Sequence, residues 1–317
     1  MPRHATKVSV NYLNSNATSH VTPASAIAEL ADNSYDAKAT NLAIDVDTVN
    51  ERKVLIISDD GYGMSYEGLK GCLNLGYSNT SSSNRRAIGR YGNGFKSSFR
   101  RLGKNVLLLS KQSGSDTVAI GLYSEQLLQD SADDELAFFT AQNLLTEDDS
   151  DPDLKTIIEN SFINDKSYFT SRYQSWTANN SMKKVRKSCT MIFIWDLDPT
   201  LDFSDSDDIR LHEKSFFNFL RPKHEMKKYS IRCYLKYIYR VPKMVIYLRN
   251  KRIVNNLPHK ELSNKSIYEY KPRFVASNVE VRMILGFDSG DYFDDYRKGG
   301  AELSFYEIKQ GKIAKIT

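Results

Sequence analysis

The chain has few cysteines and no long hydrophobic segment. Its three cysteines, Cys72, Cys189 and Cys233, are far apart and lack CxxC spacing, so the sequence indicates neither a disulfide framework nor a zinc site. No apolar run approaches the roughly 18 residues that span a bilayer, and the N-terminal sequence MPRHATKVSV lacks the apolar centre of a signal peptide. We therefore expect an intracellular protein with ordinary buried thiols and no membrane partner.

Basic residues are missing from one long segment. Residues 124–154 hold ten acidic and no basic residues, so the rest of the chain carries a formal charge of +15 although the total is +5. The positive charge of the chain outside residues 124–154 suits an anionic partner. The length of 317 residues and the hydrophobic content of 40% are enough for about two domains with real cores.

The first half of the chain alternates helical segments with strand pairs. The expected elements are a helix from Thr22 to Ala39, a hairpin of 42–47 and 53–58, a short helix over 66–73, a helix over 95–101, and a hairpin of 105–111 and 117–122. A mobile loop rich in Gly, Ser and Asn precedes the helix that begins at Phe95. The buried strand CTMIFIW, from Cys189 to Trp195, should complete the sheet. This order predicts an α/β fold, a sandwich of a mixed sheet with helices on one face.

The second half of the chain has a different pattern, which suggests a second domain. We expect a first domain over residues 1–200, with an acidic insertion at about 124–187 that contains helices over 153–162 and 167–180, and a second domain over 201–317. The second domain should begin with a helix over 208–220 and contain strands over 279–287 and 303–309. The final residues KIAKIT lack turn or tail composition, which suggests that the natural protein continues.

Residues 229–240 and 243–249 are predicted to form a strand pair. Apolar and polar residues alternate in the first of them, which predicts one buried face and one basic face that carries an aromatic side chain. Such a face can hold a phosphodiester backbone, although many exposed strand faces have this composition for solubility alone. The run KKVRK just before Cys189 leaves the same two alternatives open, a phosphate contact or a solvated basic turn.

The helix that begins at Thr22 carries a polar stripe. Glu29, Asn33 and Asp36 recur at i, i+4 and i+7, while Ile27, Leu30, Ala31 and Ser34 occupy the opposite side. A carboxylate can orient or deprotonate a water, and a carboxamide one turn away can ligate a hard cation through oxygen. Taken alone, the stripe equally fits an ordinary amphipathic helix with a solvated face.

Two glycine-containing turns follow this helix. In DDGYGM, the carboxylate of Asp59 at the end of a buried strand can accept a hydrogen bond from an exocyclic amine, and the glycines let the backbone approach a flat ring. In GRYGNGFKS, glycines at a helix N-terminus can direct backbone N–H groups at an anion. A DDG turn is also common in hairpins, and GxGxxG-like strings occur widely. The chain contains no GxxxxGK[ST] sequence, which disfavours a P-loop enzyme.

The three motifs together resemble a known set. ELADNSYD, then DDGYGM, then a Ser/Asn/Gly loop that leads into GRYGNG, is similar to the N, G1 and G2 boxes of the GHKL ATPases, which share the Bergerat fold. The segments TSHVTPASAIAELADNSYDAKATNLAIDV and AIGRYGNGFKSSFRRLGKNVLLLSK look most like the microrchidia (MORC) family. The segment LRPKHEMKKYSIRCYLKYIYRVPKMVIYLRNKRI resembles the S5-like α/β transducer domain of that family. The resemblance is tightest over 19–111 and looser over 208–317.

The resemblance implies an ATPase site and assigns residues to it. Glu29 matches the general base, Asn33 the Mg²⁺ ligand, and Asp36 a support near the ribose and purine. Four further residues match the adenine pocket, namely Asp59, Gly63, Met64 and Thr190. Matches to the phosphate-binding end of the loop are Gly92, Asn93, Gly94, Phe95 and Lys96. A transducer lysine near the γ-phosphate corresponds to Lys315 or Lys309.

The family link also implies a biological role. It implies Mg-ATP hydrolysis, ATP-dependent homodimerisation, and action on double-stranded DNA and chromatin in the nucleus, with compaction and gene silencing. Two alternatives stay open: a nucleotide-gated DNA clamp or scaffold with negligible turnover, and another GHKL branch such as MutL or Hsp90. A sensor kinase is disfavoured because no phosphoacceptor-histidine helix precedes the motifs.

Overall fold

A computed structural model of the 317-residue chain provides the structure. It describes residues 22–74, 94–125, 138–147, 151–178, 187–212, 230–239, 243–255, 262–270, 281–288, 305–309 and 312–316. These residues divide into two compact units, of which the first comprises residues 1–212 and 243–252 and the second comprises 213–242 and 253–317. In the described part of the chain, no helix is both long and apolar enough to cross a membrane.

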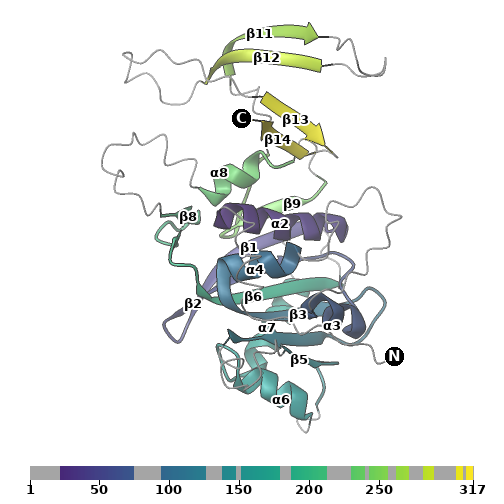
Figure 1. Ribbon diagram of the computed structural model, residues 1–317. Helices are drawn as coiled ribbons and strands as arrows, with labels where there is room; N and C mark the ends of the chain where they lie inside the picture. The colour runs from purple at the N-terminus through teal and green to yellow at the C-terminus, as the bar shows by residue number, and fades with distance from the viewer. Residues whose placement is uncertain are drawn as a thin grey trace, which may run out of the picture. The chain divides into compact units, whose positions relative to one another are not determined.

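The first unit is built on a mixed sheet (Figure 1). Across the described residues its order is β10-β9-β1-β2-β6-β3-β4-β5, and every neighbouring pair is antiparallel except β1 and β9. The strands are β1 Asn41–Val49, β2 Arg52–Asp59, β3 Gly103–Lys111, β4 Ala119–Tyr123, β5 Phe138–Ala141, β6 Cys189–Leu197, β9 Val245–Leu248 and β10 Lys251–Arg252. Both predicted hairpins form, as β1–β2 and β3–β4, and the CTMIFIW strand becomes β6 between them.

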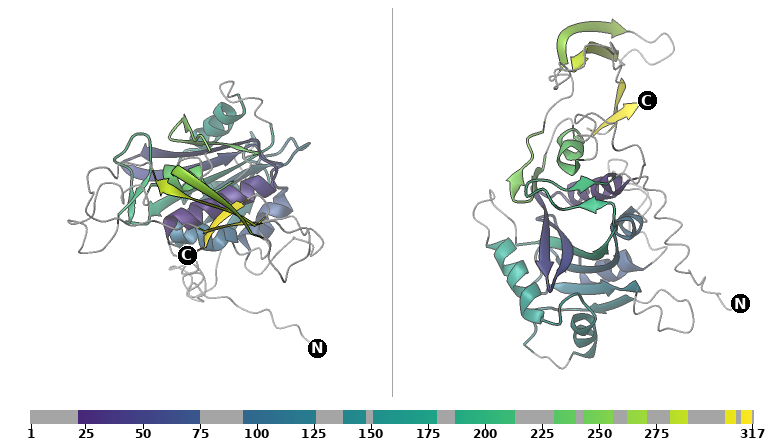
Figure 2. Two further views of the ribbon diagram at one scale, coloured as in Figure 1. Left: turned by 90° about the horizontal axis from the view of Figure 1, so that it is seen from above. Right: turned by 90° about the vertical axis from the view of Figure 1, so that its left-hand side faces the viewer.

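Helices cover both faces of this sheet (Figure 2). The helices of the first unit are α2 Pro23–Asp36, α3 Tyr66–Leu73, α4 Gly94–Leu102, α6 Pro152–Glu159 and α7 Lys166–Thr177. Leu55 and Ile57 of β2 are buried beneath α2 and α4, whereas Val54 and Ile56 belong to the core that includes α6 and α7. The α/β prediction is confirmed, but the expectation of helices on one face only is wrong, because α6 and α7 pack on the other.

Residues 138–178 are an integral part of the first unit. The strand β5 extends the sheet edge beside β4, and Phe169 in α7 packs edge-on against Phe193 of β6 with ring centroids 5.5 Å apart. Trp176 and Ile157 lie in the same core. The two predicted helices are therefore present, and their apolar faces bury the second side of the sheet.

Residues 230–252 depart from the predicted strand pair. Residues 231–236 form the helix α8 (Ile231–Lys236), whose N-cap Ser230 accepts a hydrogen bond from the backbone N–H of Cys233. The buried residues Ile231 and Leu235 are one helical turn apart, so the apolar spacing fits a helix as well as a strand. The prediction of a strand over 229–240, and of a basic strand face there, is wrong.

Two other strand assignments also differ from expectation. The 243–249 strand forms as β9, but it pairs parallel with β1, with Asn41 opposite Val245. Residues 210–211 form β8 (Arg210–Leu211), which pairs with β7 (Leu201–Asp202), so the expected helix does not begin at residue 208. The rest of that helix, residues 213–220, lies outside the described residues, as does the glycine-rich loop over 75–93.

The described part of the second unit contains α8 and two hairpins. The strands β11 (Leu262–Tyr270) and β12 (Val281–Asp288) form one hairpin, and β13 (Phe305–Lys309) and β14 (Lys312–Ile316) form the other. The predicted strands over 279–287 and 303–309 correspond to β12 and β13. Both hairpins are antiparallel, and β11 contains an irregularity between Ser263 and Ser266.

Candidate active site

The polar stripe of α2 forms as predicted. Thr22 caps the helix, because its hydroxyl accepts a hydrogen bond from the backbone N–H of Ser25 at 3.3 Å, and Pro23 occupies the first helical position. Glu29, Asn33 and Asp36 are half-buried, whereas the opposite side of the helix is buried. The helix therefore docks its apolar side and leaves the three polar side chains at the edge of the packed region.

Three polar side chains lie side by side on adjacent strands facing α2. Asp59 ends β2 and is opposite Thr190 of β6, which is in turn opposite Ser110 of β3. The three residues share the face of the sheet that α2 covers, because side chains alternate along each strand and Ser34 of α2 donates a hydrogen bond to Asp59. The hydroxyls of Ser110 and Thr190 are 3.2 Å apart. The sheet thus brings Asp59 and Thr190 together, two residues far apart in sequence.

The carboxylate of Asp59 is held in place by two donors. Its Oδ2 accepts a hydrogen bond from the Ser34 hydroxyl at 3.0 Å, and its Oδ1 accepts one from the Gly61 N–H at 2.8 Å. Asp59 is only 5% exposed. Burial raises its pKa to about 6, although both hydrogen bonds lower the pKa and the neighbouring Asp60 carboxylate adds to the rise. A buried carboxylate with fixed orientation is suited to reading one donor group of a ligand.

Asp60 fastens the turn that carries these groups. Its Oδ1 accepts hydrogen bonds from the backbone N–H groups of Thr40 and Asn41, and its Oδ2 accepts from both of their side chains. Asp60 is completely buried. These bonds tie the end of β2 to the connection between α2 and β1, so Asp60 is a structural anchor beside Asp59.

Gly63 occupies a position that needs glycine. Its φ is +65°, and a Cβ there would stand 2.0 Å from the carbonyl oxygen of Lys111. The following residue, Met64, donates its backbone N–H to the Ser110 hydroxyl at 2.8 Å. A hollow of about 330 Å³ lies beside Met64, between the start of α3 and the β3–β4 turn. Gly63 thus lets the DDGYGM turn lie close to the end of β3, while the predicted approach of this turn to a flat ring stays a prediction.

Glu29 meets the start of α4. A Cβ placed on Gly94, the first residue of α4, would stand 2.1 Å from Glu29 Oε1, so only glycine lets the carboxylate lie this close. The adjacent helices α2 and α4 pack against each other. The acidic group of the first motif and the glycine of the last are thus in direct contact, although they are 65 positions apart.

Asn33, one turn after Glu29, has an unpaired buried atom. Its Nδ2 is shielded from solvent and has no hydrogen-bond partner. A buried amide without a partner costs about 1–3 kcal/mol, so this Nδ2 donor is available to an acceptor such as a phosphate oxygen. The site therefore combines a carboxylate, an unpaired carboxamide and a helix N-terminus with a separate buried carboxylate at Asp59.

Comparison with known proteins agrees with this geometry. Residues 21–152 match the family described as histidine kinase-, DNA gyrase B- and HSP90-like ATPase. The chain is 29% identical to MORC family CW-type zinc finger protein 3 of Mus musculus, over 96% of this chain and 35% of that protein. It is 30% identical to Protein MICRORCHIDIA 7 of Arabidopsis thaliana, over 89% of this chain and 44% of the relative. ATPase morc-1 of Caenorhabditis elegans is 31% identical over 78% of this chain and 29% of its own length.

The chain belongs to the MORC family. It spans between about a third and a half of the length of several of these relatives. The matched residues 21–152 contain all three motifs and the strands β1 to β4, so the first unit holds a GHKL ATPase domain and the α/β prediction of a Bergerat fold is confirmed.

Lys96 has a different environment from the other predicted residues of this MORC domain. Its side chain is only 2% exposed, and burial lowers the pKa of its ammonium group, an effect that the nearby Cys72 thiol opposes. Burial likewise raises the pKa of Cys72 to about 11. The Phe95 ring packs against Phe99 in a tilted arrangement, with ring centroids 5.4 Å apart. The structure thus places Lys96 near α3, and its role at a phosphate stays a prediction.

Some predicted residues of the MORC site cannot be placed. Gly92 and Asn93 lie outside the described residues. The alternatives for the γ-phosphate lysine, Lys309 and Lys315, lie in β13 and β14 of the second unit. Their assignment, like that of the S5-like transducer domain, stays a prediction.

Sequence reasoning missed three supporting residues of the MORC site. Ser34 holds Asp59, Asp60 anchors the turn, and Ser110 joins Met64 to the Thr190 strand. Ser34 was assigned to the apolar side of α2, and it is there, but as a hydrogen-bond donor. A polar residue among the buried positions of α2 was the available signal, because buried hydroxyls almost always have a partner.

Proposed function

We propose that this chain binds Mg-ATP at the Glu29–Asn33–Asp59 site and hydrolyses it to ADP and phosphate. The contact between Glu29 and Gly94 carries the proposal, because it places a carboxylate beside a helix N-terminus, the position where backbone N–H groups favour phosphate. Asp59 and Thr190 line the other end of the site, where the adenine amine would meet the fixed carboxylate.

Glu29 is the proposed general base. It would take a proton from a water whose oxygen attacks the γ-phosphorus, while the bond between that phosphorus and the bridging oxygen breaks and ADP leaves with the electron pair. The chain contributes position and electrostatics to this step, because phosphoryl transfer needs little covalent help from the protein.

Asn33 is the proposed ligand for magnesium. Carboxamide oxygen is a hard donor, and Mg²⁺ is commonly held by one or two protein groups together with phosphates and waters. Asn33 and Glu29 lie one helical turn apart on α2, so an ion held by the Asn33 oxygen and by phosphates would lie beside the proposed base. When bound, magnesium would neutralise charge on the phosphates during transfer.

Phosphate release with the Glu29→Gln variant tests the assigned base. We expect hydrolysis to fall by at least about 100-fold, the size of a general-base contribution, while ATP binding persists. Asn33→Ala should weaken binding of Mg-ATP itself. Glu159→Gln on the exposed face of α6 is the matched control and should hydrolyse ATP normally. Unchanged phosphate release by Glu29→Gln would show that the assignment is wrong.

We also propose that ATP binding closes two copies of the chain into a homodimer. Size determination with and without a nonhydrolysable ATP analogue tests this step. A dimer that forms only with the analogue, and not in Asn33→Ala, supports nucleotide-gated closure. The same mass under both conditions would contradict it. If the analogue drives dimerisation but wild-type phosphate release is negligible, the chain is a nucleotide-gated clamp.

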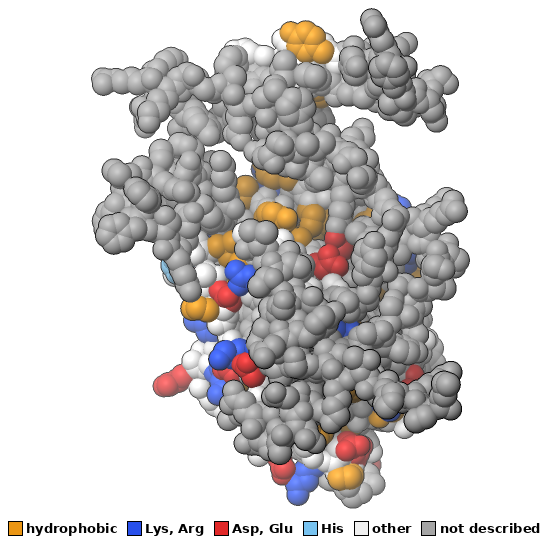
Figure 3. Space-filling view, viewed as in Figure 1, with side chains coloured by type: hydrophobic (Ala, Val, Ile, Leu, Met, Phe, Trp, Pro, Cys, Tyr) orange, Lys and Arg blue, Asp and Glu red, His pale blue; other side chains and the backbone are white. Residues whose placement is uncertain are grey.

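Double-stranded DNA is the proposed macromolecular ligand, with action on nuclear chromatin in compaction and gene silencing. The formal charge of +15 outside residues 124–154 supports it. Two basic residues of this region give it no support. Arg249 already pairs with Asp45, and Lys251 already pairs with Asp207. Figure 3 likewise shows Lys and Arg side chains interspersed with Asp and Glu on the described part of one face.

Charge reversal tests the DNA proposal within the region 223–252. The double variant Lys243→Glu/Arg252→Glu changes two exposed residues and should weaken duplex binding. Each phosphate contact that is lost should flatten the slope of log affinity against log salt by about 0.9. Lys155→Glu on α6 is the control. The same slope for the double variant and the wild type would mean that this region is only solvated.

A further inference from the structure

A second cavity lies at the opposite end of the central strands from the nucleotide site. Arg52 and Lys53 begin β2, whose last residue is Asp59, so the strand separates the two sites by about 23 Å. The strand β6 runs antiparallel to β2, which places its end at Asp196 beside the same cavity. The volume of about 580 Å³ lies in the range of small-ligand pockets.

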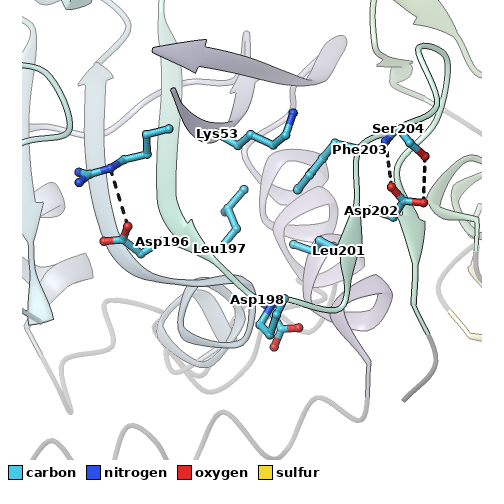
Figure 4. A pocket seen from close by; sticks show the side chains of 10 residues that line it. Lys53, Asp196, Leu197, Asp198, Leu201, Asp202, Phe203 and Ser204 are labelled. Carbon is cyan, nitrogen blue, oxygen red and sulfur yellow. Dashed lines mark hydrogen bonds and ion pairs between the residues drawn. The ribbon is translucent and has the colours of Figure 1, made fainter. Parts of the chain in front are cut away.

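The cavity has an apolar floor. Leu197, Leu201 and Phe203 provide its apolar side chains, and Leu201 is buried. Figure 4 shows Leu197 at the centre, with Asp196 to one side and Leu201 and Phe203 to the other. The Lys53 ammonium lies 5.7 Å from the centre of the Phe203 ring. A flat apolar group would find both a surface and an aromatic wall here.

The carboxylates of the cavity are already engaged. Asp196 pairs with Arg52 at 3.8 Å and accepts a hydrogen bond from Asn105 at 2.5 Å. Asp198 accepts hydrogen bonds from Arg101 and Thr200. The third carboxylate, Asp202, accepts from the backbone and hydroxyl of Ser204 and lies 3.7 Å from His212.

Lys53 is the exception among the charged groups of this cavity. In the part of the chain that the structure describes, no carboxylate lies within ion-pair distance of its ammonium. Among the charged groups that line the cavity, which include Arg52 and three engaged carboxylates, Lys53 is therefore the one available to an anion beside the apolar floor.

The backbone of Asp196 has an uncommon conformation beside the cavity. Its φ of +51° lies in the left-handed region, although the residue is within a strand and is not glycine. Such conformations cost of order 1–3 kcal/mol, and they cluster at ligand sites. The Asp196 carboxylate contacts Arg52 and Asn105.

From these contacts we propose that the cavity between the start of β2 and the end of β6 binds a small molecule with a flat apolar body and one anionic group. The apolar body lies on Leu197 and Leu201 against the Phe203 ring. The anionic group pairs with Lys53. The site is separate from the nucleotide site.

Fluorescence titration of the full chain with anilinonaphthalene sulfonate, a flat apolar anion, tests the proposal. The titration is made with saturating nonhydrolysable ATP analogue, so that the nucleotide site does not contribute. We expect saturable binding to the wild type. Lys53→Glu should weaken it by about tenfold, because one attraction is lost and one repulsion is added. Lys53→Met should weaken it less.

Two further variants separate local from global effects. Phe203→Ala removes the aromatic wall and should also weaken binding, whereas Lys155→Met, at another exposed lysine, on α6, should not change it. Thermal melts of each variant check that the fold is intact. The proposal is overturned if the wild type does not bind the probe in the presence of the ATP analogue, or if Lys53→Glu and Phe203→Ala bind as well as the control.

Discussion

Asp59 combines a functional requirement with a structural cost. The folded protein raises its pKa from 3.8 to about 6, so an ionised Asp59 at pH 7 costs about 3 kcal/mol of folding free energy. The group that is proposed to read adenine thus destabilises the protein without ligand. Stability and activity commonly oppose each other in this way.

The Asp59→Asn variant should therefore be more stable than the wild type at pH 7, by up to about 3 kcal/mol. Because the pKa of Asp59 is raised in the folded state, the folded wild type takes up a proton as the pH falls through 6. The unfolding free energy of the wild type therefore rises relative to that of the variant until the pH reaches 3.8. Denaturant unfolding at pH 7 and pH 4 measures this, and the difference should shrink at pH 4. ATP affinity should fall below pH 6 in the wild type and be weak throughout in Asp59→Asn. A variant that is less stable than the wild type at both pH values would contradict this account.

Gly94 is predicted to be essential for catalysis and not for folding. In Gly94→Ala the new methyl group would displace the Glu29 carboxylate, and a displacement of about 1 Å can cost about 100-fold in rate. Phosphate release and a thermal melt should show lost turnover in a folded protein. Gly114→Ala is the control, since its φ of +82° costs some stability but no atom lies within 4 Å of the new methyl group. Equal rates of phosphate release for the two variants would show that hydrolysis does not depend on the Glu29–Gly94 contact.

The residues that touch the proposed ligand were easier to predict than those that hold them. Glu29, Asn33 and Asp59 stand in motifs with fixed spacing, so the local sequence and the family resemblance were enough to propose them, and their roles stay predictions. Ser34 and Ser110 act through partners 25 and 46 positions away, Asp59 and Met64, and no local pattern contains such a pair. Only the folded sheet brings them together.

At the scale of the element, the helices α6 and α7 show why a predicted insertion can still be structural. The two acidic residues of α6, Asp153 and Glu159, are exposed, while the aromatic side of α7 completes the core. Phe169 is completely buried and touches the rings of Phe162, Tyr168 and Phe193. Composition alone described the segment as an insertion, because it averages over both sides of each helix.

Phe169→Ala should destabilise the first unit by about 3–5 kcal/mol, the usual loss for a buried phenylalanine. Ser175→Ala, on the exposed side of the same helix, should change the unfolding free energy by less than about 0.5 kcal/mol. Denaturant unfolding compares the two. If Phe169→Ala were as stable as Ser175→Ala, α7 would be a peripheral addition.

The helix α8 marks the limit of pattern reasoning at this scale. Residues 231–239 alternate between apolar and polar types, but Ile231 and Leu235 also fit the period of a helix. Ser230 favours the helix, because its hydroxyl caps the helix N-terminus. A capping residue directly before two apolar residues at helical spacing therefore indicated the helix better than the alternation indicated a strand.

At the scale of the whole molecule, chain order and spatial order differ at β9. The sequence suggests a boundary at residue 200, yet β9 and β10 return to the first unit and cover the outer edge of β1. A parallel pair between strands about 200 positions apart leaves no local signature, because register is set by backbone hydrogen bonds such as Val245 N–H to Thr40 O at 2.9 Å.

A chain truncated after His212 should consequently be unstable. It would expose the Asn41–Ile44 edge of β1 and remove the buried residues Ile246 and Leu248, and an exposed, apolar strand edge promotes association. We expect aggregation on size-exclusion chromatography and a lower unfolding midpoint than for the full chain. Addition of a peptide of residues 243–252 should raise the midpoint, and the same peptide with Ile246→Lys should not. A truncated chain that is monomeric and as stable as the full chain would mean that β9 is dispensable, and that the ATPase unit ends near residue 200 after all.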